Sequence, residues 1–109
     1  MAVSEDFVNY VLDQLSGWGK VSVRRMFGGA GLYREGKIFG VIAGNVAYLK
    51  VDDSTRGEFV KAGAAPFMPY PDKMKTNVSS YYEIPPEVLE NPQQLALWAQ
   101  RALEIARRG

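Results

Sequence analysis

Two arginines stand directly before a glycine-rich stretch, and together they have the residue types of a phosphate site. Arg24 and Arg25 precede the segment MFGGAGLY, residues 26–33. Glycines let a backbone come close to a phosphate group, and guanidinium groups neutralise its charge. The sequence therefore first raises the question of whether this stretch binds a nucleotide.

The spacing of these glycines does not fit the known nucleotide-binding loops. A dinucleotide loop needs G-x-G-x-x-G before a helix, but Arg34 occupies the position of the third glycine after Gly29 and Gly31. A P-loop needs a glycine followed by lysine and a hydroxyl residue, and that triplet does not occur. The residues that follow are typical of a strand and a turn, so no helix N-terminus is expected to hold the phosphate. We interpret the glycines as a bend or bulge in a strand.

The chain contains no cysteine and no histidine. A disulfide scaffold, a thiolate zinc site, a cysteine nucleophile and a Ser-His triad are therefore excluded. A Ser–Lys nucleophile built from Ser79, Ser80 and Lys75 has no supporting motif. We expect a protein that is not an enzyme and has no catalytic residue, no metal ion and no cofactor.

A second basic region lies in a proline-rich segment. Lys73 and Lys75 stand close in sequence to several tyrosines, among them Tyr81. Basic residues interleaved with aromatic ones can hold single-stranded nucleic acid by charge and stacking. Asp72 and Glu83 dilute the positive charge, so a solvated loop beside core tyrosines is the simpler interpretation.

The two arginines of the first region point to opposite faces if their segment is a strand. One of them can then meet a partner, while the other is expected to form a salt bridge near the first or the last helix. The residues that we predict as partner-binding are Arg24, Arg25, Lys73, Lys75 and Tyr81.

Helical signals occur at both ends of the chain. Residues 4–16 carry apolar side chains at helical spacing after a capping Ser4, and Gly17 is expected to end this helix in the left-handed conformation. Near the other end, Asn91 is a predicted cap and Pro92 the first residue of the last helix. This helix presents an apolar stripe of Leu95, Trp98, Ala99, Ala102, Ile105 and Ala106.

Between the helices, residues 21–51 alternate with a period of two and predict antiparallel strands. Glu35-Gly36 and Gly44-Asn45 are typical of tight hairpin turns. A second helix is expected to begin at Asp52 or Asp53 and to end at Gly63.

One more strand is expected within residues 78–85. The order α-β-β-β(β)-α-β(β)-α predicts an α+β fold with an antiparallel sheet and helices packed on one face. No linker or repeat divides the chain, so we expect one domain over residues 1–109.

Composition narrows the function classes further. The chain has 109 residues and a formal net charge of +1, which is too small to indicate nucleic-acid or membrane binding by bulk charge. The N-terminus lacks the pattern of a secretory signal, and no apolar run approaches the roughly 18 residues of a membrane span. We therefore expect a cytoplasmic protein without membrane contact.

Several segments, in this order, resemble the N-terminal domain of the TfoX/Sxy family of competence regulators. They are VRRMFGGAGLYREGKIFGVI, AYLKVD, AGAAPFMP and SYYEIPPEVLENPQQLALWAQRALEIA, which together run through nearly the whole chain. The most specific parts are the Arg-Met-Phe-Gly-Gly-x-Gly-Leu-Tyr segment and the Tyr-Tyr-x-x-Pro segment before the last helix.

The resemblance implies an α+β domain with an antiparallel sheet, similar to secretion-chaperone-like folds. It also implies a link to natural transformation and to transcription that depends on the cyclic-AMP receptor protein. Full-length regulators of the family carry a second, helical domain, so we expect this chain to be a stand-alone N-terminal domain. The family pattern defines no catalytic residues.

The resulting functional hypothesis is a non-enzymatic regulatory or protein-interaction domain in transcriptional regulation or a competence-type pathway. The expected partner is a protein of the transcription machinery or one of its regulators. Direct nucleic-acid binding by a basic and aromatic surface is the first alternative, and small-ligand binding is the second. An exposed sheet edge or face would also allow a homodimer.

Overall fold

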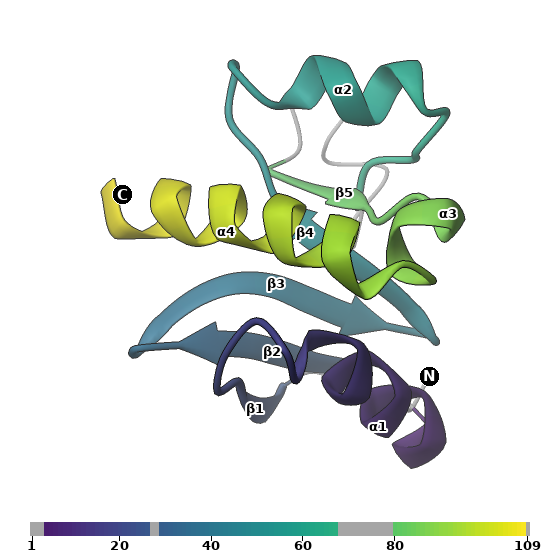
Figure 1. Cartoon of the computed structure of the whole chain (residues 1–109), viewed down its shortest axis with the longest axis vertical. Coiled ribbons are helices and arrows are strands. Elements are labelled where there is room, and N and C mark those ends of the chain that lie inside the picture. The colour runs from purple at the N-terminus through teal and green to yellow at the C-terminus, as the bar shows by residue number, and fades with distance from the viewer. Residues whose placement is uncertain (1–3, 27–28, 68–79, 109) are drawn as a thin grey trace.

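The computed structural model describes residues 4–26, 29–67 and 80–108 (Figure 1). Its helices are α1 (Glu5–Leu15), α2 (Arg56–Lys61), α3 (Pro86–Leu89) and α4 (Pro92–Arg108). Its strands are β1 (Ser22–Met26), β2 (Gly29–Arg34), β3 (Lys37–Ala43), β4 (Val46–Lys50) and β5 (Tyr81–Glu83). Of the helices in these ranges, none has the length and apolar content that crossing a bilayer requires.

The described strands form one antiparallel sheet in the order β1-β2-β3-β4-β5, so each strand lies beside its neighbour in sequence. The two predicted hairpin turns are confirmed. Both central residues of each turn have positive φ, with 55° and 78° at Glu35 and Gly36 and 54° and 62° at Gly44 and Asn45. Two-residue turns of this kind match the right-handed twist of the strands that they join.

The strand register divides the side chains of the sheet between two faces. Val23, Leu32, Gly40, Leu49 and Tyr82 lie opposite one another in successive strands. This row belongs to the face that packs on the helices, because Leu32 and Leu49 are buried in the core. The neighbouring residues in each strand point the other way.

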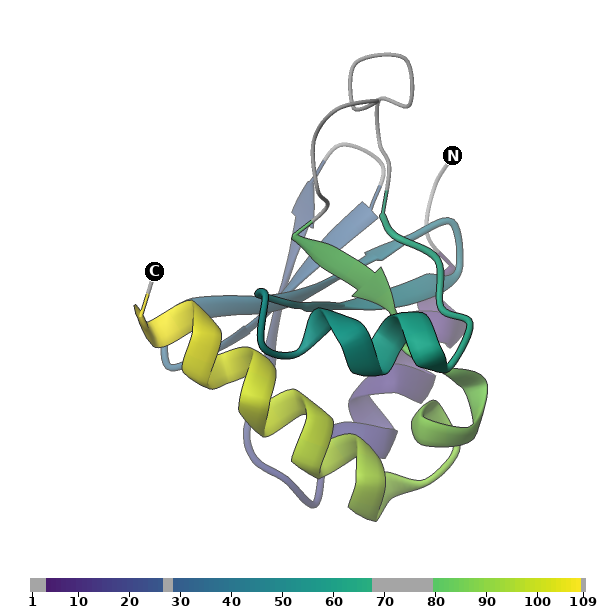
Figure 2. The ribbon, with the colours of Figure 1, turned by 90° about the horizontal axis from the view of Figure 1, so that it is seen from above.

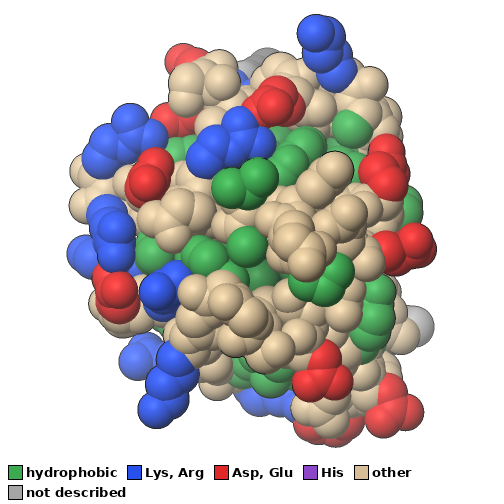
Figure 3. All heavy atoms as spheres, viewed as in Figure 1, with side chains coloured by type: hydrophobic (Ala, Val, Ile, Leu, Met, Phe, Trp, Pro, Cys, Tyr) green, Lys and Arg blue, Asp and Glu red, His purple; other side chains and the backbone are tan. Residues whose placement is uncertain are grey.

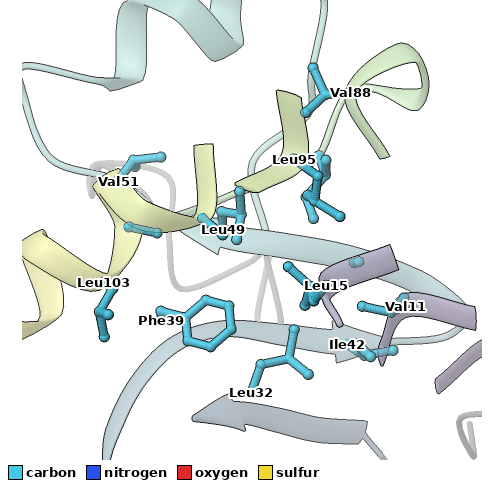
Figure 4. Packing of buried hydrophobic residues seen from close by; sticks show 14 of the residues in the cluster. Val11, Leu15, Leu32, Phe39, Ile42, Leu49, Val51, Val88, Leu95 and Leu103 are labelled. Carbon is cyan, nitrogen blue, oxygen red and sulfur yellow. The ribbon is translucent and has the colours of Figure 1, made fainter. Parts of the chain in front are cut away.

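The core lies between the sheet and the four described helices. Val11 and Leu15 of α1 and Leu95 and Leu103 of α4 are at most 1% exposed, and they meet the buried side chains of the sheet (Figure 4). Figure 2 shows the helices on one side of the sheet. The predicted α+β fold, with helices packed on one face of an antiparallel sheet, is therefore confirmed.

The helix caps that the sequence indicates are present. The Ser4 hydroxyl accepts a hydrogen bond from the backbone N–H of Phe7 at 3.3 Å. The Asn91 side chain accepts one from the N–H of Gln94 at 3.1 Å, directly before Pro92 begins α4. These bonds satisfy N–H groups that the first turn of a helix leaves without a backbone partner.

Two predicted helix boundaries are wrong. Gly17 does not have the left-handed conformation, because α1 ends at Leu15 and Ser16 follows in the right-handed helical region. Regular helix in α2 begins at Arg56 and not at Asp52 or Asp53, because residues 53–55 form a turn. The Asp52 carboxylate accepts hydrogen bonds from the N–H groups of Ser54 and Thr55 at 2.9 and 3.2 Å, so Asp52 caps this turn before the helix. The predicted end of α2 at Gly63 is confirmed by its φ of 81°.

The two edges of the sheet differ. On one edge, the backbone N–H of Phe67 donates to the carbonyl of Tyr81 and the N–H of Glu83 donates to the carbonyl of Ala65, both at 2.9 Å. Residues 65–67 therefore cover β5. The other edge is β1, which in the described part of the chain pairs only with β2.

Candidate functional site

The glycine-rich stretch builds a hairpin and not a phosphate loop. Met26 pairs with Gly29, so the chain reverses direction between them, and β2 then leads through a tight turn into β3 without a helix. A Cβ atom on Gly29 would lie 2.4 Å from the backbone oxygen of Ile42. Glycine is needed at this position because two strands approach closely. Phe27 and Gly28 lie outside the described residues.

The prediction that Arg24 and Arg25 lie on opposite faces of a strand is confirmed. Arg25 pairs with Ala30 on the helix side of the sheet and forms an ion pair with Glu5 in the first turn of α1. The side chains of Arg25 and Glu5 are 48% and 74% exposed. An ion pair this exposed adds little stability, but it engages Arg25 within the fold, as the sequence indicates for one of the two arginines.

Arg24 lies on the opposite face, which no described helix covers. Its guanidinium carbon is 4.8 Å from the centre of the Tyr33 ring. Arg24 itself is exposed, and no carboxylate within the described ranges forms an ion pair with it. The Tyr33 ring covers one side of the guanidinium, and its outer side can receive an anionic group.

Tyr81 lies on the same face at the other side of the sheet. The Lys50 ammonium is 5.2 Å from the centre of its ring, and the Phe67 ring stands edge-on to it at 6.5 Å. Burial raises the pKa of the Tyr81 phenol above 10.0, and the nearby Tyr33 phenol adds to the shift. Tyr81 is thus partly buried among its neighbours.

We call the face opposite the helices the open face. The register and ring contacts assign to it a band of aromatic side chains with a cation near each end. Its members are Arg24, Tyr33, Val41, Tyr48, Lys50, Phe67, Tyr81 and Glu83, the last of which lies opposite Tyr48. Tyr48 lies 4.9 Å from Phe67 between ring centres, so the aromatic band is continuous on the β4–β5 side.

The predicted partner-binding residues are only partly brought together. Arg24 and Tyr81 share the open face, whereas Arg25 lies on the helix side. Lys73 and Lys75 lie outside the described residues. Sequence reasoning missed Tyr33 and Lys50, because their place beside Arg24 and Tyr81 depends on strand register. A homodimer through an exposed sheet edge or face stays a prediction.

A second group of arginines lies near the C-terminal end of α4, where Figure 3 shows blue and red side chains side by side. Arg101 pairs with Glu58, Arg107 with Glu35, and Arg108 with Asp52. A hydrogen bond and the charge of Arg107 lower the pKa of Glu35 below its usual 4.5. Because each of these cations has a carboxylate partner, this group does not form a free anion site.

Within the described ranges, no three carboxylates lie close enough together to hold a metal ion.

Among the protein families, the TfoX N-terminal domain matches residues 13–106 of the chain. No curated protein matches the sequence.

Proposed function

The chain belongs to the TfoX N-terminal domain family, and from this premise we propose that it is a regulatory domain without catalytic activity that binds a protein partner through the open face. The family is associated with competence regulation, and its members are generally non-catalytic regulators. The partner that fits this role is a protein of the transcription machinery or one of its regulators.

The observation that supports this proposal is the unequal covering of the sheet. All described helices pack on one face, while on the open face the partly buried rings of Tyr33, Tyr48, Phe67 and Tyr81 have no described helix above them. Aromatic residues and arginine are the types enriched in the centres of protein interfaces. A partner that covers this band would gain apolar burial without rearrangement of the sheet.

Arg24 gives the surface a specific contact. Its guanidinium is held on the Tyr33 ring, so little side-chain freedom is lost when a partner carboxylate binds to it. A charge-assisted hydrogen bond of this kind is stronger than a neutral one. We therefore expect the partner to place an acidic residue beside the β1 side of the open face.

Capture from a lysate of the source organism, followed by affinity measurement with the captured protein, tests the proposal. Arg24→Ala is expected to weaken binding about tenfold, as loss of an interface arginine commonly does. Arg25→Ala is the matched control, because it removes a neighbouring charge from the opposite face of the same strand, and its affinity should change less than about twofold. Equal losses in both variants would contradict the assignment of the open face.

Direct binding of single-stranded nucleic acid is the second candidate. Two cation–ring pairs, Arg24 on Tyr33 and Lys50 on Tyr81, favour it, because aromatic rings and cations together hold bases and phosphates. This candidate predicts that a labelled single-stranded oligonucleotide binds at low salt and loses affinity steeply as salt is added. Absence of any mobility shift at low salt would remove it.

A further inference from the structure

A groove at one end of the sheet, away from the Arg24 side of the open face, is not explained by the proposed function. It lies between α1, the turn that joins β3 to β4, and α3, at the side of the molecule where Figure 3 shows mainly red side chains. Its apolar lining includes Phe7, Tyr10, Ala47, Ile84, Pro86 and Leu89.

The walls of the groove are fixed by hydrogen bonds between distant parts of the chain. The backbone N–H of Ser4 donates to the Asn45 side chain at 3.1 Å, which ties the start of α1 to the turn. The Gln14 amide donates to the carbonyl of Leu89 at 2.9 Å, which ties α1 to α3. A groove with such fixed walls is present before any ligand binds.

The size of the groove indicates what fits into it. Its volume is about 200 Å³, which is below the ~300–1,000 Å³ of pockets that enclose a whole small molecule. One large apolar side chain fits better, as the anchor residues of protein interfaces do. Tyr10 supports this, since it is 39% exposed although its ring lines an apolar groove.

The charge around the groove is negative and unbalanced. Glu90 lines it, and Glu87 lies on the same short helix as the lining residue Leu89. Glu83 borders the groove where β5 ends, but its side chain lies beside Tyr48 on the open face. In the described ranges none of these three glutamates forms an ion pair, whereas Glu35, Asp52 and Glu58 are each paired with an arginine of α4. An occupant with a positive charge would supply the missing partner.

We propose that the groove is a docking site for a basic peptide segment of a partner protein. One large apolar side chain of the segment enters the groove, and a flanking lysine or arginine pairs with Glu90. This site goes beyond the proposed function, because its anchor pocket and its acidic side differ in place and in charge from the basic Arg24 side of the open face.

Short blocked peptides of matched sequence test the site by ¹H–¹⁵N NMR titration of the full chain. The probe is acetyl-KKLKK-amide, with acetyl-KKSKK-amide lacking the anchor and acetyl-EELEE-amide reversing the charge. The lysine–leucine probe is expected to shift the amide signals of α1, α3 and the β3–β4 turn. Replacing leucine by serine should weaken binding about tenfold, because the apolar burial is lost.

A charge reversal in the protein provides the second arm. Glu90 is exposed at the end of α3, so Glu90→Lys is expected to fold normally, which a thermal melt verifies. It should weaken binding of the lysine–leucine probe about tenfold and strengthen binding of the glutamate–leucine probe. Arg24→Ala should leave both affinities unchanged, so a failure of this site is separable from a failure of the open face.

Three results would overturn the proposal. They are the absence of shifts at the groove, equal shifts with the serine peptide, and an unchanged affinity in Glu90→Lys.

Discussion

The guanidinium carbon of Arg34 lies 4.4 Å from the centre of the Trp18 ring, and its Nη1 donates a hydrogen bond to the Trp18 carbonyl at 3.4 Å. The same indole donates from Nε1 to the Gln100 side chain at 2.9 Å and packs edge-on against Phe39. One ring therefore joins the loop after α1 to β2, β3 and α4.

Removing this cation should lower stability measurably. Arg34→Ala is expected to reduce the free energy of unfolding by about 1 kcal/mol, because a cation over a partly buried tryptophan contributes that much. Urea denaturation followed by circular dichroism measures it. Arg24→Ala is the control, since Arg24 also lies on a ring but is exposed, and its effect should stay below about 0.5 kcal/mol. A larger loss for Arg24 than for Arg34 would refute this ranking.

Gly29→Ala should destabilise the fold by a steric clash between two paired strands. The new Cβ would meet the backbone oxygen of Ile42 at 2.4 Å, and a backbone atom in a paired strand cannot move aside as a side chain can. We expect a loss of about 2–3 kcal/mol in the free energy of unfolding, typical of overpacking. Gly57→Ala is the control, because nothing lies within 4 Å of its Cβ. In the helical segment of α2 it should raise stability by up to about 1 kcal/mol. Similar effects at both positions would contradict the steric explanation.

Stability should fall in acid and change little near neutrality. Hydrogen bonds lower the pKa of Glu35, through Arg107, and that of Asp52, through Ser54. A carboxyl with a lowered pKa stabilises the fold above its unfolded pKa, and this contribution is lost as pH falls through the folded value. The urea midpoint should therefore decline below the ordinary values of 4.5 and 3.8. It should stay level between about pH 6 and 8, since the chain has no histidine.

The double variant Glu35→Gln with Asp52→Asn provides the control for the acid transition. Its midpoint should be lower at neutral pH and should decline less in acid. An acid transition identical to that of the original chain would show that other carboxyls cause it.

Two tyrosines should ionise at a higher pH in the folded protein than in the unfolded chain. Burial raises the pKa of Tyr48 and of Tyr81 above 10.0, with smaller contributions from Glu83 and Tyr33 respectively. A group with a raised folded pKa contributes stability below its unfolded pKa, and this is lost as pH rises through the folded value. Tyrosinate absorbance should therefore show a delayed component that urea abolishes and that Tyr81→Phe reduces. A single titration near 10 in the folded protein would contradict this.

The sequence predicts those parts of the fold that depend on neighbours in the chain. The hairpins at Glu35-Gly36 and Gly44-Asn45 and the cap at Asn91 follow from a few adjacent residues, and all three are confirmed. The alternation of Arg24 and Arg25 also follows from strand period alone. The predicted start of α2 is too early, because a turn over residues 53–55, capped by the Asp52 carboxylate, precedes the regular helix at Arg56.

Only single residues of the open face could be predicted from the sequence; the surface that they form together, and the groove, could not. Arg24 and Tyr81 are recognisable as basic and aromatic residues, but their common face depends on pairing across five strands. The groove joins Phe7 to Leu89, which are far apart in sequence and meet only through the packing of α1 on α3. No local pattern carries information of that kind.

The difference between the two sheet edges bears on aggregation. Residues 65–67 close the β5 edge, so of the described edges β1 is left as a template on which a foreign strand could grow. Arg24 and Arg25 place one charge on each face of that strand, and like charges on two copies repel when such edges approach. Because Arg25 is paired with Glu5, we expect Arg24 to supply most of this repulsion and so to oppose fibril-like stacking of folded chains.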